Sequence, residues 1–433
     1  MRKNLGVATA IVIIAVVVAI VAGFGVGWVV HTTTTNSTNT NTTTGLHGVY
    51  AIGAAIPLTG DLGTYGQNAN FALQLAETQI NNMLAASNAG WSIKLIVLDT
   101  KTDPGTALTD TKTLAADGCQ AIIGYYSSGE LSNCKAYAED NDIVLISPSS
   151  TAVSLAIDKP YIFRFVPADN AQGPAMAAQI WAEGIKYMVP LYMVNTYGEG
   201  LAESTESAFI ALGGTVSTQN VSYDPTTTSD YTALVQQLNG YVASAISTYG
   251  ASHVCVYAVT YEEVENIMDV AATDYNNTLG AVKWFGCDGS ALSAKVTSDP
   301  ISAAFAIQTQ FPATYYAPTN SSIQTQVMQY VAAKTGNVPD PYAFGSYDAL
   351  WVVAKCMGLT QQYSGTAINT VLPTVANYTF GASGWDQLNQ YGDAIAVGYQ
   401  YWQVYKVNST AYSWYLAGYY DSNTGQITNY PSP

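Results

Sequence analysis

The chain has 433 residues, of which 48% are hydrophobic and only 10% are charged, and its formal net charge at pH 7 is -16. Nucleic acid is not an expected partner, because binding a phosphate backbone requires a basic protein surface. The length exceeds that of one ordinary hydrophobic core and favours two domains, while low charge and 32 tyrosines indicate an extracellular protein with a hydroxyl-rich surface.

A charge-free apolar segment occupies residues 5–30, and the basic residues Arg2 and Lys3 precede it. The segment exceeds both the roughly 20 residues that span a bilayer and the ~7–15-residue core of a secretory signal. Because the basic residues come first, residues 1–4 are expected in the cytoplasm and the remainder of the chain outside. We interpret 5–30 as an uncleaved transmembrane anchor, with a processed leader as the alternative.

Residues 31–47 are rich in threonine, asparagine and serine, and they contain too few apolar side chains to offset the entropy of ordering. The segment is predicted to be a disordered stalk that holds a binding module off the membrane. Seven N-x-S/T sequons indicate glycosylation of a secreted chain. They begin at Asn36, Asn41, Asn220, Asn276, Asn320, Asn377 and Asn408.

Short apolar runs then alternate with amphipathic stretches. The first series is a strand at 49–58, a helix at 65–84, a strand at 91–100, a helix at 103–117, a strand at 119–126, a helix at 128–141 and a strand at 142–148. The second is a strand at 187–195, a helix at 198–213, a strand at 214–223, a helix at 231–244, a strand at 253–259, a helix at 262–275 and a strand at 281–287. Such alternation predicts two α/β units with parallel sheets, which the segments after about residue 307 are expected to complete.

Two strands of the first series end in clusters of small hydroxyl residues. These are Ser127 and Ser128 after "AIIGYY", and Ser149, Ser150 and Thr151 after "LISP". Ligands of open parallel sheets lie beyond the carboxyl ends of the strands. Ser127 has capping-box spacing to Glu130, and a helix start offers N–H groups and a partial positive charge to an anion. The clusters therefore predict a carboxylate site without Arg or Lys; the alternative is that they only cap a helix and form a turn.

The five cysteines show no CxxC pair and no metal-ligand spacing. We interpret them as buried small hydrophobic residues; the alternative is one local disulfide between Cys119 and Cys134.

Several motifs follow one another in order: "IGAAIPLTGDLGTYGQNANFALQLAETQIN", "LDTKTDPGTA", "AIIGYYSSG", "LISPSST", "FRFVPADNAQGPAMA" and "NTYGEGLAES". From about Val49 onward the chain resembles the extracytoplasmic solute-binding proteins of branched-chain amino acid ABC transporters, the leucine/isoleucine/valine-binding type in particular. The resemblance implies a type I periplasmic-binding fold, in which three chain crossings join two α/β lobes around a ligand cleft. Lobe 1 is then 48–167 with 309–380, and lobe 2 is 168–308 with 381–433.

The resemblance also implies ligand contacts. It assigns the α-carboxylate of an amino acid to Ser127, Ser128, Ser149, Ser150 and Thr151, the side-chain walls to Tyr65 and Tyr197, the α-ammonium to Asp288, and one further contact to Thr260 or Tyr261. This set suits a zwitterion, since each charge that loses its water needs a partner. Asp288 stands where the family has glutamate, and Thr260 where it has tyrosine, so the ligand itself stays open. Asp288 before Gly289 is alternatively a turn residue.

The function that these residues imply is capture of an amino acid, branched-chain type first, by lobe closure and delivery to an ABC transporter permease. The sequence contains no HExxH, GxSxG or P-loop motif, and its three histidines offer no catalytic pattern. We therefore expect neither an enzyme nor a cofactor. The alternatives are a binding protein for an amide or urea-like solute, a sensory receptor module, and a structural protein of the cell surface.

Overall fold

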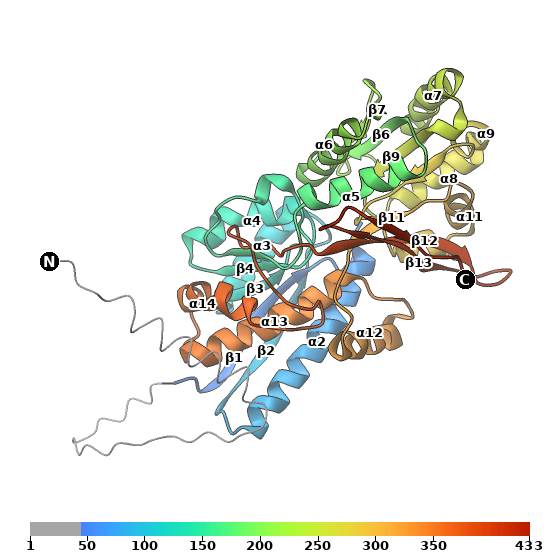
Figure 1. Cartoon of the computed structure of the whole chain (residues 1–433). Coiled ribbons are helices and arrows are strands. Elements are labelled where there is room, and N and C mark those ends of the chain that lie inside the picture. The colour runs from blue at the N-terminus through green and yellow to red at the C-terminus, as the bar shows by residue number, and fades with distance from the viewer. Residues whose placement is uncertain (1–44) are drawn as a thin grey trace, which may run out of the picture.

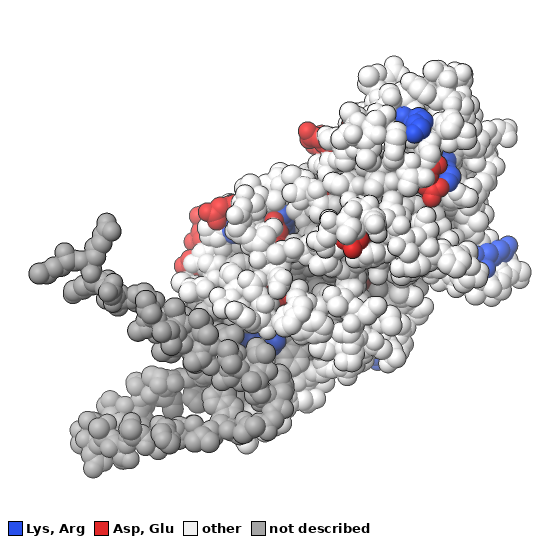
Figure 2. All heavy atoms as spheres, in the orientation of Figure 1, with Lys and Arg blue, Asp and Glu red and all other residues white. Residues whose placement is uncertain are grey.

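The computed structural model describes residues 45–433. Residues 1–44, which hold the predicted anchor at 5–30, most of the predicted stalk, Asn36 and Asn41, lie outside the described residues. The prediction of a disordered stalk up to residue 47 is wrong at its end, because Leu46 is buried in the hydrophobic core. Within 45–433, no helix is both long enough and apolar enough to cross a membrane. Charged side chains are sparse and scattered over the face of the molecule shown in Figure 2.

The first sheet consists of five parallel strands in the order β2-β1-β3-β4-β5. They are β1 (Gly48–Ile56), β2 (Trp91–Asp99), β3 (Ala121–Gly124), β4 (Val144–Ser147) and β5 (Ile162–Arg164). The accompanying helices are α2 (Gly63–Ala86), α3 (Pro104–Ala116), α4 (Ser128–Asp140), η1 (Val153–Leu155), α12 (Ser322–Thr335), α13 (Pro341–Thr360) and α14 (Gly365–Asn377).

Strand β1 shows why this sheet is covered on both faces. Its alternate residues Ile52, Ala54 and Ile56 belong to one hydrophobic core, while Ala55 belongs to a second core on the opposite face. Successive side chains of a strand point to opposite faces, so a run of apolar residues without polar alternation requires helices on both sides. Figure 1 shows this layered unit at one end of the molecule, with its strands and first helices in blue to teal and helices α12, α13 and α14 in brown to orange.

The second sheet is also parallel, with the order β10-β9-β6-β7 and with β8 paired to β6. Its strands are β6 (Tyr187–Met193), β7 (Thr215–Val216), β8 (Val221–Tyr223), β9 (Val254–Val259) and β10 (Lys283–Phe285). Its helices are α5 (Asp169–Ala182), α6 (Thr196–Ala211), α7 (Thr232–Tyr249), η2 (Ala251–His253), α8 (Val264–Asp274), α9 (Asn276–Leu279), α10 (Ala294–Ser298) and α11 (Pro300–Gln308). The strand predicted at 214–223 is two short strands, because the chain turns where Ser217 Oγ donates to the carbonyl of Gln219 (2.8 Å).

A third, antiparallel sheet corrects the expectation that the C-terminal segments complete the two parallel sheets. Its order is β11-β12-β13-β14. The strands are β11 (Ala313–Tyr316), β12 (Gly398–Lys406), β13 (Tyr412–Asp421) and β14 (Ile427–Asn429). The short connection at 407–411 explains the difference, because parallel neighbours need a crossover of a dozen or more residues. β11 lies in predicted lobe 1 and the other strands in predicted lobe 2, and the lobe boundaries stay a prediction.

The sequence marks two helix starts, with Asp103 before Pro104 as an N-cap signal and Ser127 three residues before Glu130 as a capping box, and the structure confirms both. The side chain of Asp103 accepts from the N–H of Thr106 and begins α3, and Ser127 forms a complete capping box with Glu130 at α4. All five cysteines are free and buried, so the alternative of a Cys119–Cys134 disulfide is wrong.

Two helical glycines give a test of this packing. At Gly66 in α2, an added Cβ would lie 1.9 Å from the carbonyl oxygen of Pro57, whereas at Gly240 in α7 it would meet nothing within 4 Å. We expect Gly66→Ala to lower the free energy of unfolding by about 1–3 kcal/mol, since the backbone must shift. Gly240→Ala should raise it by about 0.5–1 kcal/mol. Urea denaturation measures both, and equal effects at the two positions would contradict the close approach of α2 to Pro57.

Candidate ligand-binding site

The two hydroxyl clusters hold each other in place. Ser149 Oγ donates to the carbonyl of Tyr126 (2.7 Å), and Ser150 Oγ donates to Ser128 Oγ (3.1 Å). Ser128 Oγ also accepts from the N–H of Ala152 (3.1 Å). These bonds join the loops that follow β3 and β4, at the carboxyl ends of neighbouring parallel strands. The hydroxyl of Ser127 caps helix α4, so for this residue the alternative prediction, a helix cap, is the correct one.

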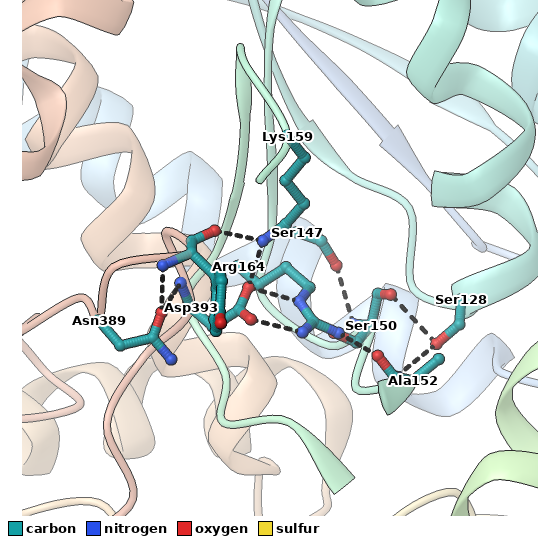
Figure 3. A network of polar contacts seen from close by, with 9 residues as sticks. Ser128, Ser147, Ser150, Ala152, Lys159, Arg164, Asn389 and Asp393 are labelled. Carbon is teal, nitrogen blue, oxygen red and sulfur yellow. Dashed lines mark hydrogen bonds and ion pairs between the residues drawn. The ribbon is translucent and has the colours of Figure 1, made fainter. Parts of the chain in front are cut away.

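A buried ionic network supports the loop that follows β4 (Figure 3). Arg164, at the end of β5, donates through Nη1 to the carbonyls of Ser150 (3.1 Å) and Ala152 (2.9 Å). Its Nε and Nη2 donate to the two carboxylate oxygens of Asp393 (2.7 and 2.6 Å), which also accepts from Lys159 Nζ (2.7 Å). The expectation of an anion site free of Arg and Lys is therefore incomplete. The predicted contacts include no Arg or Lys, but Lys159 and Arg164 both bind the carboxylate of Asp393 on the side of the loop away from those contacts.

Asp288 lies in the interior, with 3% of its surface exposed. Its carboxylate accepts from Tyr197 Oη (2.5 Å), from Gln172 Nε2 (2.8 Å) and from the hydroxyl of Tyr342. Burial raises the pKa of this carboxyl above its ordinary value, and the three donors oppose the rise. Asp288 stands in a turn, as the alternative interpretation has it, and its side chain is also a buried acceptor held by donors from three helices.

A second carboxylate, Asp169, lies beside Asp288 and was not predicted as a contact. It is fully buried, and neither of its oxygens has a hydrogen-bond partner within residues 45–433. Burial, followed by repulsion from Asp288, raises its pKa well above the ordinary value. The hydroxyl of Thr151, which faces the carboxylate without forming a hydrogen bond of normal geometry, and the charge of Arg164 lower it. The N–H of Asp169 donates to the carbonyl of Thr151 (2.9 Å), which places the carboxylate next to the hydroxyl cluster.

Thr151 and Thr260 contribute two more polar atoms without a partner. Both side chains are buried, and both Oγ1 atoms lack hydrogen bonds among the described residues. A buried polar atom without a partner loses the free energy of its bonds to water, so several of them in one region are unusual in a folded protein. Their gathering near Asp169 and Asp288 is typical of a site that a ligand completes.

Tyrosine rings close the region around the carboxylates. Tyr197 and Tyr261 stack with ring centroids 5.3 Å apart. Tyr65 donates its hydroxyl to the carbonyls of Gly289 (3.1 Å) and Ala291 (2.9 Å), and its ring lies edge-on to Tyr342 at 6.3 Å. The predicted residues Tyr65, Tyr197, Tyr261 and Asp288 therefore converge from different elements.

Three of the residues in this region were missed by sequence reasoning. Asp169 stands in the quoted segment "FRFVPADNAQGPAMA", but an acidic residue at a helix start has an ordinary explanation in the helix dipole. Gln172 follows in the same segment. Tyr342 is one of 32 tyrosines and carries no motif of its own, so only the fold reveals its contact with Asp288.

The periplasmic binding protein family model matches residues 49–411. The chain belongs to the periplasmic binding protein family. An uncharacterised protein of Methanocaldococcus jannaschii is 29% identical over 397 residues, which cover 88% of this chain and 91% of that protein. A leucine-, isoleucine-, valine-, threonine- and alanine-binding protein of Pseudomonas aeruginosa is 30% identical over 155 residues, which cover 35% of this chain and 40% of that one.

Solved structures place this periplasmic binding protein in the type I fold with two parallel sheets. A leucine binding protein of Thermotoga maritima matches with a TM-score of 0.68 at 19% identity, covering 88% of this chain and 99% of that chain. A solute binding protein of an ABC transporter from Rhodopseudomonas palustris BisB5, in complex with 3,4-dihydroxy benzoic acid, matches with a TM-score of 0.67 at 16% identity, covering 86% and 98%. Identities this low show a shared fold and leave the ligand open.

Two hollows lie away from the predicted contacts of this periplasmic binding protein. One, of about 140 Å³, is lined by residues such as Phe165, Tyr316 and Trp385, and the other, of about 430 Å³, by residues such as Gln179 and Tyr401. None of the ten predicted ligand contacts lines either hollow. The candidate site is thus the closed, tyrosine-walled region around Asp169 and Asp288.

The sequons of the described chain differ in accessibility. Asn220, Asn276, Asn320 and Asn408 are exposed. Asn377 is half-buried, and its Oδ1 accepts from the N–H of Leu388 (2.7 Å). Glycosylation at all of these positions stays a prediction, with Asn377 the least accessible acceptor.

The ionic network behind the β4 loop gives the second test. Asp393→Ala leaves Lys159 and Arg164 buried without their carboxylate, and we expect the free energy of unfolding to fall by about 3–5 kcal/mol. The control is Glu139→Ala, which removes a partly exposed pair with Lys135 (2.7 Å) and should cost less than about 1 kcal/mol. Urea denaturation compares them, and a similar small loss in both variants would mean that Asp393 does not balance the buried cations.

Proposed function

We propose that this extracytoplasmic solute-binding protein of the ABC transporter type captures an α-amino acid, branched-chain type first, between its lobes. The observation that carries the proposal is the unpartnered, fully buried carboxylate of Asp169 next to Asp288 and next to the hydroxyl cluster at Thr151. An isolated buried charge is costly, and a cation that enters with the ligand removes that cost.

The two ends of a zwitterion find different partners here. Asp169 offers two free oxygens to the α-ammonium, and Asp288, whose oxygens already accept from Tyr197, Gln172 and Tyr342, is the second anion of the pair. The unpartnered Oγ1 of Thr151 suits the α-carboxylate. The N–H groups of Ser149, Ser150 and Ala152 already donate to the hydroxyls of Ser147 and Ser128, so they hold the loop in place and do not bind the ligand. Arg164 behind that loop adds positive potential without occupying the site.

The side-chain pocket is proposed from the tyrosines. Tyr65, Tyr197 and Tyr261 present aromatic faces, while the hydroxyls of Tyr65 and Tyr197 are engaged with the backbone and with Asp288. Faces without free polar groups suit an aliphatic side chain. An aromatic carboxylate such as the ligand of the Rhodopseudomonas protein lacks a cation for Asp169, which favours an amino acid over that class.

The transport steps extend this proposal to the whole chain. Ligand binds one lobe, the lobes rotate closed, and the closed form delivers the solute to a permease. The apolar segment at 5–30 is proposed to anchor the module at the outer side of the cytoplasmic membrane through the stalk at 31–47.

A thermal-shift screen with amino acids, short amides and urea ranks the solutes, because a ligand of the native state raises the unfolding midpoint. A response to amides or urea alone would redirect the proposal to the amide class, and no response at all would favour a surface-structural role.

Opposite effects on stability and binding identify the buried carboxylates. Asp169→Asn replaces a buried acid by a neutral amide, so we expect the ligand-free variant to melt higher than the wild type wherever the pH exceeds the raised pKa of Asp169. The same variant should bind leucine roughly a hundredfold or more weaker, because breaking a buried charge pair costs about 3–5 kcal/mol. Calorimetry and thermal melting measure both, with exposed Asp117→Asn as the control. Unchanged leucine affinity in Asp169→Asn and Asp288→Asn would reject the zwitterion site.

The affinity for leucine and the stability of the ligand-free protein should both depend on pH, in opposite directions. Burial raises the pKa of Asp169 and Asp288 in the ligand-free protein, and an ammonium group requires their ionised forms. Protons therefore compete with the ligand, so affinity for leucine should rise as pH increases through the raised pKa values and level off above them. Ligand-free stability should move the other way, since the folded state holds these protons more tightly than the unfolded state. Calorimetric titrations across this pH range test the claim, and an affinity independent of pH would contradict it.

A further inference from the structure

The start of helix α2 receives its cap from the other lobe. The N-cap residue, Leu62, has no side-chain hydrogen bond, and the first turn contains no acidic residue. Instead, the carboxylate of Glu262 accepts from the N–H of Thr64 (3.1 Å) and from Thr64 Oγ1 (2.6 Å). Because α2 belongs to lobe 1 and Glu262 follows β9 in lobe 2, these bonds cross the cleft.

Glu262 is built into lobe 2 for this contact. It is fully buried, and the same oxygen that binds Thr64 Oγ1 also accepts from Ser293 Oγ (2.8 Å), another buried residue of lobe 2. The backbone N–H of Glu262 donates to the carbonyl of Asp61 (3.2 Å), again across the cleft. The carboxylate is therefore fixed in position by its own lobe and presented to the helix start of the other.

The contact adjoins the proposed ligand site on both sides. Tyr65 follows Thr64 directly, and Tyr261 precedes Glu262 directly. An anion at the N-terminus of a helix is stabilised by the free N–H groups and the helix dipole, and bonds to a charged acceptor are stronger than neutral ones. Separation of the lobes breaks these bonds and leaves α2 without a cap.

We propose that Glu262 and Thr64 form an interlobe latch, a positioning pair that holds the closed state and thereby slows release of the ligand. This inference rests on the proposed function only for its binding readout. The latch sets the closing equilibrium, so its loss acts on ligand dissociation and leaves the first encounter with the open protein unchanged. Ligand contacts at Tyr65 and Tyr261 remain in place when the latch is removed.

The test combines kinetics with hydrogen exchange on the full chain. Stopped-flow measurements with L-leucine should show that Glu262→Gln raises the dissociation rate constant on the order of tenfold, with the association rate constant within about twofold of wild type. Thr64→Val, which removes only the hydroxyl, should show a smaller rise, and Thr64→Ser should restore wild-type dissociation. Glu265→Gln, at the start of α8 and without a side-chain hydrogen bond to lobe 1 among the described residues, is the matched control.

Hydrogen exchange of the ligand-free protein tests the latch independently of the proposed ligand. Amides of the first turn of α2 should exchange faster in Glu262→Gln than in wild type, while amides in the interior of lobe 2 keep their protection. If wild type binds no amino acid, the proposed function fails and this exchange result alone decides the latch. Unchanged exchange at residues 63–66 overturns the latch, and so does faster exchange spread over all of lobe 2, which would mean that Glu262 only stabilises its own lobe.

Discussion

The constraint on which the candidate site depends is the burial of two carboxylates, Asp169 and Asp288, in one closed region. Desolvation favours their neutral forms, and the charge of Asp288 adds to the cost of ionising Asp169. Asp288 is compensated by hydroxyl and amide donors, whereas neither oxygen of Asp169 has a hydrogen-bond partner among the described residues. In the proposed function, the cost of burying this acid is recovered when the cation of a ligand enters.

The hydroxyl side of the site depends on contacts between distant parts of the chain. The loop at Ser150–Ala152 is held through its carbonyls by Arg164, and Arg164 is held in turn by Asp393, 229 residues further along. The backbones of Arg164 and Asp393 pair beside β5, so the segment between α14 and β12 is fixed to the sheet that carries the loop. This segment thus anchors the hydroxyl half of the candidate site.

Sequence reasoning was strongest where signals are local. The alternation of strands and helices, the cap at Asp103 and the capping box at Ser127 follow from neighbouring residues, and the structure confirms them. It was weakest where a role is assigned by the fold. Nothing near Tyr342 marks it as a donor to Asp288, nothing near Asp393 marks it as the partner of Arg164, and the antiparallel sheet pairs segments that looked like completions of two parallel ones.

The neighbouring acids Glu262 and Glu263 show how far a local interpretation reaches. Their position before α8 suggests that both serve the dipole of that helix, yet each serves a different purpose. Glu263 accepts from the hydroxyl of Tyr223 and from the N–H of Tyr261 (3.1 Å), so it orients the ring that stacks on Tyr197. Glu262 caps α2. One short loop at the end of β9 therefore contacts α2 through the first carboxylate and positions the ring of Tyr261 through the second, so the proposed latch and the proposed ligand wall depend on adjacent residues.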